Sequence, residues 1–382
     1  MRVAIVGPAD SFKSGISAYS DRLADAFARA GHETWYVPIR TLLPRFLFPG
    51  KPRGASATAT ERPYRMGPAL DYHSPRSILA ARRWVRQQGF DLVVVPWWTA
   101  AAAHMTLPLV RAAKQAGATV VVDVHETRDP REERFWPARV YGRWALRRIA
   151  RRADLAVTHA GSLAKTVRFE VPEASGKVRV MPHPAYDQYG PRVRKSEARR
   201  LLGIQGKVVV LHFGLLRRYK GVADLVASLD HLPDALRRNA EVWVVGEAWG
   251  GRSDLAAALA ASPHRDRVRV VDRYVPDAGV ALWFSAADVV VLPYRRAAQS
   301  GVLGVAKSFS VPVVVSSVGG LPEAVRDYPW KAVCRPHDPA SIARALVQAL
   351  GQPYVGTGYR PYSWDDAVRE LEAAALPLAA GA

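Results

Sequence analysis

The sequence contains a single cysteine, Cys334, among its 382 residues. One thiol excludes a disulfide framework and a cysteine-rich metal site. No apolar run approaches the roughly 20 residues of a membrane span. The start, Met1 to Gly7, lacks the charged, apolar and cleavage regions of a signal peptide. These absences predict a protein of a reducing, bacterial-type cytoplasm.

Acidic residues are also scarce, since 34 Asp and Glu face 54 Lys and Arg, which gives a formal net charge of +20. An excess of this size favours phosphate-bearing partners: nucleic acid, an anionic membrane surface or a charged substrate. No nucleic-acid recognition motif is present, and the cations are spread along the chain instead of alternating with aromatics. We therefore expect no nucleic-acid partner. The strict Gly-x-Gly-x-x-Gly fingerprint is missing too, which argues against a nicotinamide or flavin enzyme.

What the sequence does contain is a regular alternation of apolar strands and helices. The strand candidates are continuous Val- and Ile-rich runs, as in sheets that are covered on both faces. They are 2–7, 33–38, 91–98, 119–125, 155–160, 177–182, 207–213, 241–246, 268–273, 288–293 and 312–317. Helices at about 15–30, 77–88, 105–116 and 136–153 separate several of them. The alternation predicts an α/β fold with two Rossmann-like, doubly wound parallel sheets.

The length suits two domains. We expect an N-terminal domain over 1–187, a C-terminal domain over 188–352, and a tail, 353–382, whose helix at about 364–376 returns to the first domain. Pro184, Gly190 and Pro191 mark the hinge. The proline-rich segment 40–76 shows little periodicity, and loops of that length tend to be functional or mobile.

Two strand ends in the second half carry the strongest chemical signal. The run 208–212 leads into a glycine turn that carries Arg217 and Lys220, and 289–294 leads into a helix start at Gln299-Ser300-Gly301-Val302. Ligands of open α/β sheets bind beyond the carboxyl ends of the strands. Cations and the N–H groups of a helix start both attract anions. The two ends together predict a diphosphate pocket.

At this point the sequence resembles the retaining, nucleotide-sugar-dependent glycosyltransferases of the GT-B architecture, carbohydrate-active family four, in its glutamine-serine-glycine subgroup. The resemblance rests on an ordered set of motifs along almost the whole chain. They are Ser14-Gly15-Ile16, Gly31-His32-Glu33, Pro96-Trp97-Trp98-Thr99, Val124-His125, the run 181–187, Phe213-Gly214 through Lys220-Gly221, Val245-Gly246-Glu247, Leu292-Pro293-Tyr294, Gln299-Ser300-Gly301 and the run 318–323. It implies two domains that face a central cleft, with the donor on the second and the acceptor on the first.

The resemblance also assigns roles to individual residues. His125, Arg217 and Lys220 are the expected catalytic residues, with the two cations on the departing diphosphate. The expected donor-binding residues are Gly15, Gly214, Gly246, Tyr274, Gln299, Ser300, Gly301, Val302 and Glu323. Simpler interpretations stay open: Arg217 and Arg218 as a solvated pair, Ser300 as a helix cap, His125 as a satisfied polar group and Trp97 and Trp98 as core. Glu323 binds a sugar hydroxyl or stabilises its helix start.

The chain departs from the family at three positions. Leu215 stands where an arginine is usual, and Arg217 matches a known variant spacing. Ala297 and Val305 occupy the places of two glutamates, so ribose recognition by a carboxylate does not transfer. No Asp-x-Asp pair occurs, and we therefore expect metal-independent transfer, with no metal and no cofactor apart from the nucleotide-sugar substrate. A sugar-nucleotide epimerase of the same architecture and an inactive sugar-nucleotide-binding subunit are the alternatives.

The acceptor is expected to be a lipid-linked glycan or a small natural product, and the positive charge favours the first. A helix with Arg139, Arg143, Arg147 and Arg151 at four-residue spacing suggests peripheral docking on the inner face of an anionic membrane, with 42–48 inserting beside it. An ordinary solvated helix face is the simpler interpretation.

Overall fold

The computed structural model describes residues 1–9, 12, 14–42, 62–127, 132, 135–205, 208–352 and 359–379. The chain divides into two compact units, each with its own sheet. Unit 1 comprises 1–182 and 362–382, and unit 2 comprises 183–361. The division falls after Pro182 and not after residue 187, and the tail joins unit 1 from Tyr362 onwards. Most of the irregular segment expected at 40–76 lies outside the described residues.

Unit 1 is built on a parallel sheet of eight strands. The strands are β1 (Arg2–Pro8), β2 (Glu33–Thr41), β3 (Arg65–Met66), β4 (Leu70–Asp71), β5 (Leu92–Trp97), β6 (Thr119–Val124), β7 (Leu155–Thr158) and β8 (Val178–Val180). Their order is β3-β2-β1-β5-β6-β7-β8, and β4 also pairs with β2. The central strands β1, β5, β6 and β7 are buried because their apolar sequences are covered on both faces, while β3 at the edge is exposed. The two-residue strands β3 and β4 fall inside the segment for which the sequence predicted no strand.

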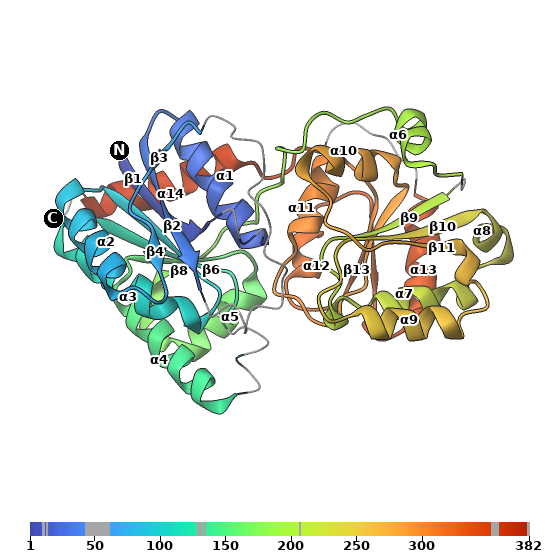
Figure 1. Cartoon of the computed structure of the whole chain (residues 1–382), viewed down its shortest axis with the longest axis horizontal. Coiled ribbons are helices and arrows are strands. Elements are labelled where there is room, and N and C mark those ends of the chain that lie inside the picture. The colour runs from blue at the N-terminus through green and yellow to red at the C-terminus, as the bar shows by residue number, and fades with distance from the viewer. Residues whose placement is uncertain are drawn as a thin grey trace. The chain divides into compact units, whose positions relative to one another are not determined.

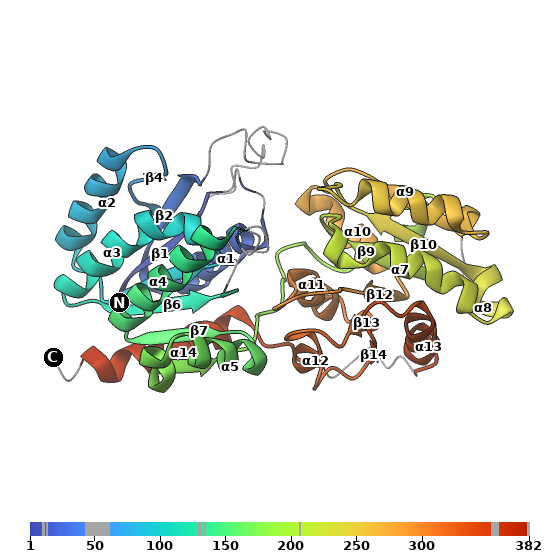
Figure 2. The same ribbon diagram turned by 90° about the horizontal axis from the view of Figure 1, so that it is seen from below.

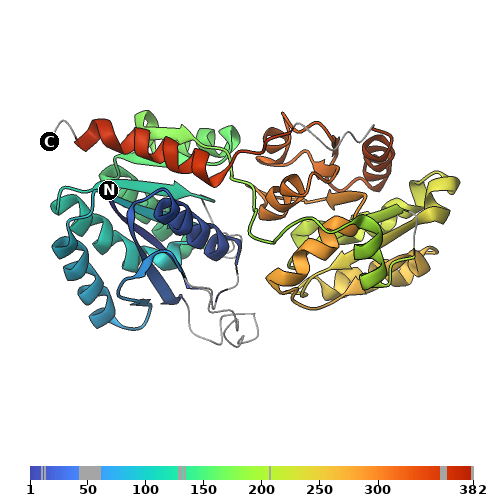
Figure 3. The ribbon, with the colours of Figure 1, turned by 90° about the horizontal axis from the view of Figure 1, so that it is seen from above.

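The helices of unit 1 connect consecutive strands and cover the sheet. They are α1 (Gly15–Arg29), α2 (Pro75–Gln88), α3 (Ala103–Gln115), α4 (Trp136–Arg152), α5 (Gly161–Glu170) and α14 (Trp364–Ala379). The last of these comes from the tail and packs against α1 (Figures 1 and 3). Trp364 at its start contacts Tyr19 of α1, with ring centroids 5.1 Å apart. Among the described residues, no helix combines the length and apolar character needed to cross a bilayer.

Unit 2 has a six-stranded parallel sheet in the order β11-β10-β9-β12-β13-β14, and Figure 2 shows the strands from β10 to β14 in this sequence. The strands are β9 (Val208–Phe213), β10 (Ala240–Val245), β11 (Val268–Val271), β12 (Val289–Leu292), β13 (Val313–Ser316) and β14 (Lys331–Cys334). The helices are α6 (Lys195–Leu202), α7 (Val222–Ala227), α8 (Asp234–Asn239), α9 (Arg252–Ala261), α10 (Asp277–Ala286), α11 (Gly301–Ser308), α12 (Leu321–Ala324) and α13 (Pro339–Leu350). In Figure 1, α6 and α10 lie on one face of the sheet and α7 and α9 on the other.

The predicted fold class, two doubly wound parallel-sheet units, is confirmed. The strand order of unit 2 reverses direction between β9 and β12, which are hydrogen-bonded neighbours. At such a switch point the two outgoing connections leave toward opposite faces, and a crevice opens between them. Both motifs that the sequence singled out follow these two strands.

Candidate active site

The candidate site of unit 2 is formed by the connections after β9 and β12. After β9 the chain passes Gly214 and a short 3-10 turn, Arg218–Lys220, before α7 begins at Val222. After β12 it passes Tyr294 and enters α11 at Gly301. Because the two strands are neighbours in a parallel sheet, both connections start at the same edge.

Gly214 is the point at which the two connections meet. Its backbone has a φ of +100°, a conformation that favours glycine. A Cβ atom at this position would lie 3.3 Å from Nζ of Lys220 and 3.2 Å from Cγ2 of Val302. The lysine-bearing turn and the first turn of α11 therefore share one space, and the lack of a side chain at Gly214 leaves it open.

Lys220 directs its ammonium group into this space. Nζ lies 5.1 Å from the ring centre of Tyr294, a cation–π distance. Burial lowers the pKa of Lys220, and the nearby positive charge of Arg217 adds to this shift. Within the described part of the chain no carboxylate pairs with Lys220, and none of the described residues therefore neutralises its charge. An anionic ligand would supply the missing counter-charge.

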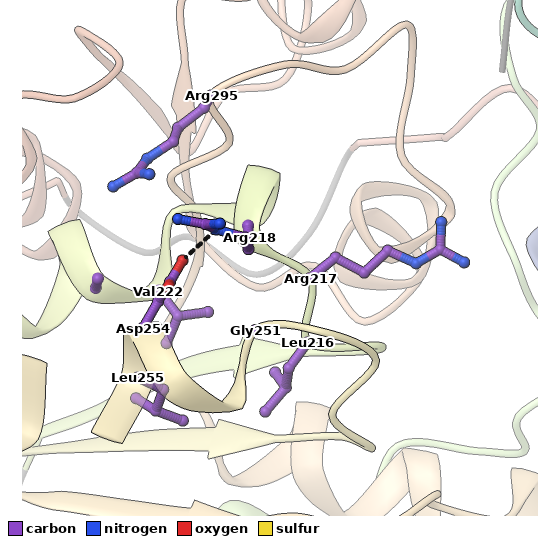
Figure 4. Close-up of a pocket in the computed structure, with 9 residues that line it drawn as sticks. Leu216, Arg217, Arg218, Val222, Gly251, Asp254, Leu255 and Arg295 are labelled. Carbon is purple, nitrogen blue, oxygen red and sulfur yellow. Dashed lines mark hydrogen bonds and ion pairs between the residues drawn. The ribbon is translucent and has the colours of Figure 1, made fainter. Parts of the chain in front are cut away.

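Among the residues that the structure describes, the other cations near the turn differ in whether a carboxylate pairs with them. Nε of Arg218 lies 2.7 Å from the Asp254 carboxylate, and Arg295 makes two contacts of 2.9 and 2.8 Å with Asp224. Arg217 instead lies over the ring of Trp249, 5.5 Å from its centre. Figure 4 shows its guanidinium extending away from the Arg218–Asp254 pair. Arg217 and Arg218 are therefore not an equivalent solvated pair.

The start of α11 has no side-chain cap. Ser300 occupies the N-cap position, but its hydroxyl makes no capping hydrogen bond and lies 3.3 Å from the Tyr294 hydroxyl. The interpretation of Ser300 as an ordinary cap is therefore wrong. The N–H groups of a first helical turn have no acceptor within the helix. Here Ser300 does not occupy them, which suits the binding of an anion.

Gly301 has a packing role that the sequence did not reveal. A Cβ atom there would lie 3.2 Å from the ring of Tyr186, and one at Gly304 would lie 3.0 Å from the same ring. The two glycines thus make room for an aromatic side chain from the segment before α6. The expected close approach of a phosphate is not needed to explain Gly301.

The other residues that were expected to bind the donor lie on several different connections of unit 2. Gln299 directly precedes the α11 start, and Glu323 lies half-buried in the first turn of α12. The loop before α12 is tied to the Gln299 loop, because Gly320 N–H donates to the carbonyl of Ala298 at 3.0 Å. Tyr274 follows β11, an edge strand that β10 separates from β9. Val305, at one glutamate position, is buried in α11 and cannot reach a ribose.

Gly246, one of the expected donor-binding residues, has a structural role in positioning the turn. Its φ is +149°, and a Cβ atom there would lie 2.0 Å from the carbonyl oxygen of Gly214. Gly214 in turn donates to Val245 O at 2.9 Å. The end of β10 therefore holds the Gly214 turn by direct backbone contact.

We expect Gly246→Ala to lower the free energy of unfolding by more than the about 1–3 kcal/mol of a strained φ, because the methyl group also collides with backbone. Urea denaturation measures this loss. Gly250→Ala is the matched control: its φ is +92°, but an added Cβ meets nothing within 4 Å. Equal losses in the two variants would contradict the role of the Gly246–Gly214 contact.

In unit 1, Gly15 is the first residue of α1, the helix that follows β1. Ser14 caps this helix by accepting from Ser17 N–H at 3.1 Å. An added Cβ at Gly15 would meet nothing within 4 Å. Among the described residues, neither packing nor backbone conformation therefore requires glycine here.

His125 does not present its ring as expected. The residue follows β6, but it is only 3% exposed and its ring packs edge-on against Tyr19 at 4.7 Å. Burial lowers the pKa of His125 to about 4, although the nearby Asp123 carboxylate opposes this shift. At neutral pH the ring is therefore uncharged and enclosed within unit 1. The alternative interpretation, a polar group satisfied inside the fold, fits this environment.

The sequence analysis missed the partners of His125, namely Asp123 and His159. Nε2 of His159 lies 2.9 Å from Asp123, and Nε2 of His125 lies 3.6 Å from the same carboxylate. Nδ1 of His159 faces the carbonyl of Met181 at 3.0 Å. Ligating atoms of the three residues lie within 4.8 Å of one another, so this cluster could also hold a metal ion. An aspartate inside the Val-rich strand β6 was the signal available in the sequence.

Trp97 and Trp98, considered as a possible sugar platform, belong to the packing of unit 1. Trp97 is buried in the hydrophobic core, and Trp98 is partly buried against it. The core interpretation of both residues is the one that the structure supports.

Comparison with known proteins shows which families the two units resemble. Residues 13–186 match the family described as Glycosyltransferase Family 4, and residues 207–352 match Glycosyl transferases group 1. D-inositol 3-phosphate glycosyltransferase from Streptomyces scabiei is 31% identical over 282 residues, which cover 69% of this chain and 61% of that protein. The chain thus spans less than two thirds of this relative's length.

Solved structures share the fold over nearly the whole chain. Sucrose-phosphate synthase from Thermosynechococcus elongatus superposes with a TM-score of 0.69 at 19% identity, covering 99% of this chain and 97% of the other. Anabaena HepE in complex with UDP-glucose superposes with a TM-score of 0.64 at 16% identity, covering 100% and 98%. At these identities the likeness shows a common fold.

Proposed function

Because its two halves match glycosyltransferase family 4 and glycosyl transferases group 1, the chain belongs to the glycosyltransferases, and we propose that it transfers a sugar from a nucleotide-sugar donor to a hydroxyl acceptor. The observation that carries this proposal is the convergence of Lys220 and Val302 on Gly214 within unit 2. A lysine ammonium and an uncapped helix start then act on the same diphosphate.

The proposed reaction forms a bond between the acceptor oxygen and the anomeric carbon and breaks the bond from that carbon to the diphosphate. Negative charge grows on the departing oxygen, and the acceptor proton is released. Lys220, Arg217 and the first N–H groups of α11 stabilise that charge more in the transition state than in the bound donor. We propose that the acceptor attacks from the face that the diphosphate leaves, so that configuration is retained.

We propose a uridine-containing donor, because Anabaena HepE, which has the same fold, was solved with UDP-glucose. The acceptor is proposed to be a hydroxyl of a lipid-linked glycan or of a small molecule. D-inositol 3-phosphate belongs in the test panel since the sequence relative is named for it. Charge stabilisation by Lys220 and Arg217, together with a sequence that contains no Asp-x-Asp pair, supports a transfer that needs no divalent ion.

The test begins with thermal unfolding of the full chain against UDP, GDP, ADP, dTDP and their sugars. A ligand at 100 times its Kd stabilises the folded protein by about 2.7 kcal/mol, so the matching nucleotide should raise the melting temperature by several degrees. Transfer is then measured with and without acceptors, with and without EDTA, and the product's anomeric configuration is read by NMR.

Each alternative gives a different result in this experiment. Conversion of the donor sugar without any acceptor would identify an epimerase, and donor binding without turnover on any acceptor would identify a binding subunit. No stabilisation by any nucleotide would overturn the proposal. Loss of transfer in EDTA, restored by a divalent ion, would overturn metal independence alone.

A further inference from the structure

Helix α4 exposes an unusual set of large apolar side chains. Trp136 is 66% exposed, Val140 60% and Trp144 46%, and Phe135 and Tyr141 beside them are exposed as well. We call these five residues the aromatic face of α4. Solvent-exposed apolar patches on a folded unit mark surfaces that bind a partner or a membrane.

The aromatic face is separate from the side of α4 that builds the core. Ala145, Leu146, Ile149 and Ala150 are buried in unit 1, where α4 packs on α3 (Figure 1). Trp136, Val140 and Trp144 follow one another at four-residue spacing and so form a stripe along the helix. Tyr141 is also exposed and stacks with Trp144, with ring centroids 5.8 Å apart.

The charged side chains of α4 itself are all arginines, while the Glu132 carboxylate lies near Tyr141. The sequence of α4 contains six arginines and no acidic residue. Arg147 and Arg151 share the single carboxylate of Glu173 on a neighbouring turn, so one of the four positive charges of the predicted arginine stripe is balanced. Arg139 and Arg143 are exposed, and no carboxylate in the described ranges pairs with them. Arg148 lies over the Trp144 ring at 5.5 Å.

We propose that the aromatic face of α4 docks unit 1 on an anionic lipid bilayer. Tryptophan and tyrosine prefer the boundary between headgroups and acyl chains, and arginines at the same depth bind lipid phosphates. A helix with one apolar-aromatic face and basic residues beside it lies in the plane of the membrane surface. A second copy of the chain fits this face poorly, because a two-fold contact would oppose one set of arginines to another.

The proposal is independent of the transfer reaction, since it concerns a surface of unit 1 and not the donor site. It is tested by co-sedimentation of the full chain with vesicles of phosphatidylglycerol and phosphatidylcholine, and with phosphatidylcholine alone, at low and high salt. We expect binding to the anionic vesicles that falls at high salt, and at least tenfold weaker binding to phosphatidylcholine.

Two variants separate the aromatic and the charge contributions. Trp136→Ala with Trp144→Ala should weaken binding at least tenfold at both salt concentrations. Arg139→Gln with Arg143→Gln should weaken binding at low salt and flatten its salt dependence. Arg83→Gln with Arg86→Gln on α2 is the matched control, because it removes the same charge from another exposed helix of unit 1.

All substituted side chains are at least partly exposed, so unchanged melting temperatures should show that each variant folds. The proposal fails if the tryptophan variant binds like the original chain, or if the α2 control loses as much binding as the α4 arginine variant. It also fails if the chain does not sediment with the anionic vesicles at low salt. Sedimentation velocity tests whether the chain forms a dimer instead. A dimer that the tryptophan substitutions dissociate would show that the aromatic face binds a second copy of the chain and not a bilayer.

Discussion

Lys220→Ala should lower turnover by roughly 10- to 150-fold, with a much smaller effect on donor affinity. The magnitude follows from a charge-assisted contact of about 1.5–3 kcal/mol, since each 1.36 kcal/mol corresponds to a factor of ten in rate. Turnover carries the effect because the diphosphate gains negative charge as the bond to the sugar breaks. Initial rates at saturating acceptor, with the donor concentration varied, give kcat and KM separately.

The neighbouring Arg218 provides the control for this prediction. It belongs to the same turn and carries the same charge, but it is already paired with Asp254 and points away from the Arg217 side (Figure 4). Arg218→Ala should therefore change turnover by less than about twofold, as expected for an exposed ion pair. A Lys220→Ala protein with full activity would remove the proposed role of the lysine, even if nucleotide binding persisted.

The architecture was predictable because its signals are local. Runs such as 208–211 and 289–292 are apolar throughout, a pattern that is typical of a strand covered on both faces. The shortest strands, β3 and β4, were not predicted, because two residues carry no periodicity. The segment Lys331–Cys334, which forms β14 at the sheet edge, was missed as well, because four residues with one lysine and one exposed valine do not form a continuous apolar run.

The convergence in unit 2 was also within reach of the sequence. Parallel strands place their carboxyl ends at one edge, so Gly214 and Val302 were expected near each other once β9 and β12 were recognised. The sequence could not predict which arginine of the turn forms an ion pair. Asp254 is 36 residues away from Arg218 and meets it only because α9 packs beside α7. Ion pairs between residues this far apart in the sequence can be identified only once the three-dimensional structure is known.

In unit 1 the sequence predicted the position of a site residue but not its surroundings. The position of His125 at a strand end was predicted, but its direction was not, since a side chain at that point can turn to either face. The structure buries the ring beside Asp123 and His159, which lie on or after neighbouring strands β6 and β7. Their proximity follows from the strand order, which the sequence alone did not give.

This buried cluster leads to a prediction about stability. Burial alone would raise the pKa of Asp123, but the facing imidazoles of His159 and His125 outweigh it and hold the pKa well below its ordinary value. The carboxylate is therefore charged at neutral pH, and it is compensated by the contact with Nε2 of His159 at 2.9 Å. A hydrogen bond to a charged group contributes about 1.5–3 kcal/mol, and we expect at least that loss for Asp123→Ala in urea denaturation at pH 7.

The control for this variant is Asp154→Asn, one strand away. Asp154 pairs with Lys114 at 2.8 Å, but its side chain is partly exposed, so water replaces part of the lost interaction. Its loss of stability should be clearly smaller than that of Asp123→Ala. Equal losses, or an Asp123→Ala protein as stable as the original chain, would contradict a compensated buried charge at Asp123.

The same cluster fixes how stability depends on acid. The pKa of His125 is about 4 in the folded chain and about 6.5 when unfolded, so the unfolded state takes up the proton first and stability falls as pH drops from 6.5 to 4. Asp123, whose folded pKa is depressed, loses its contribution only in stronger acid. His125→Asn lacks this titrating imidazole, so it should lose less stability over the same pH range. Urea midpoints between pH 7.5 and 4 measure both curves, and equal losses in the two proteins would contradict the role of His125.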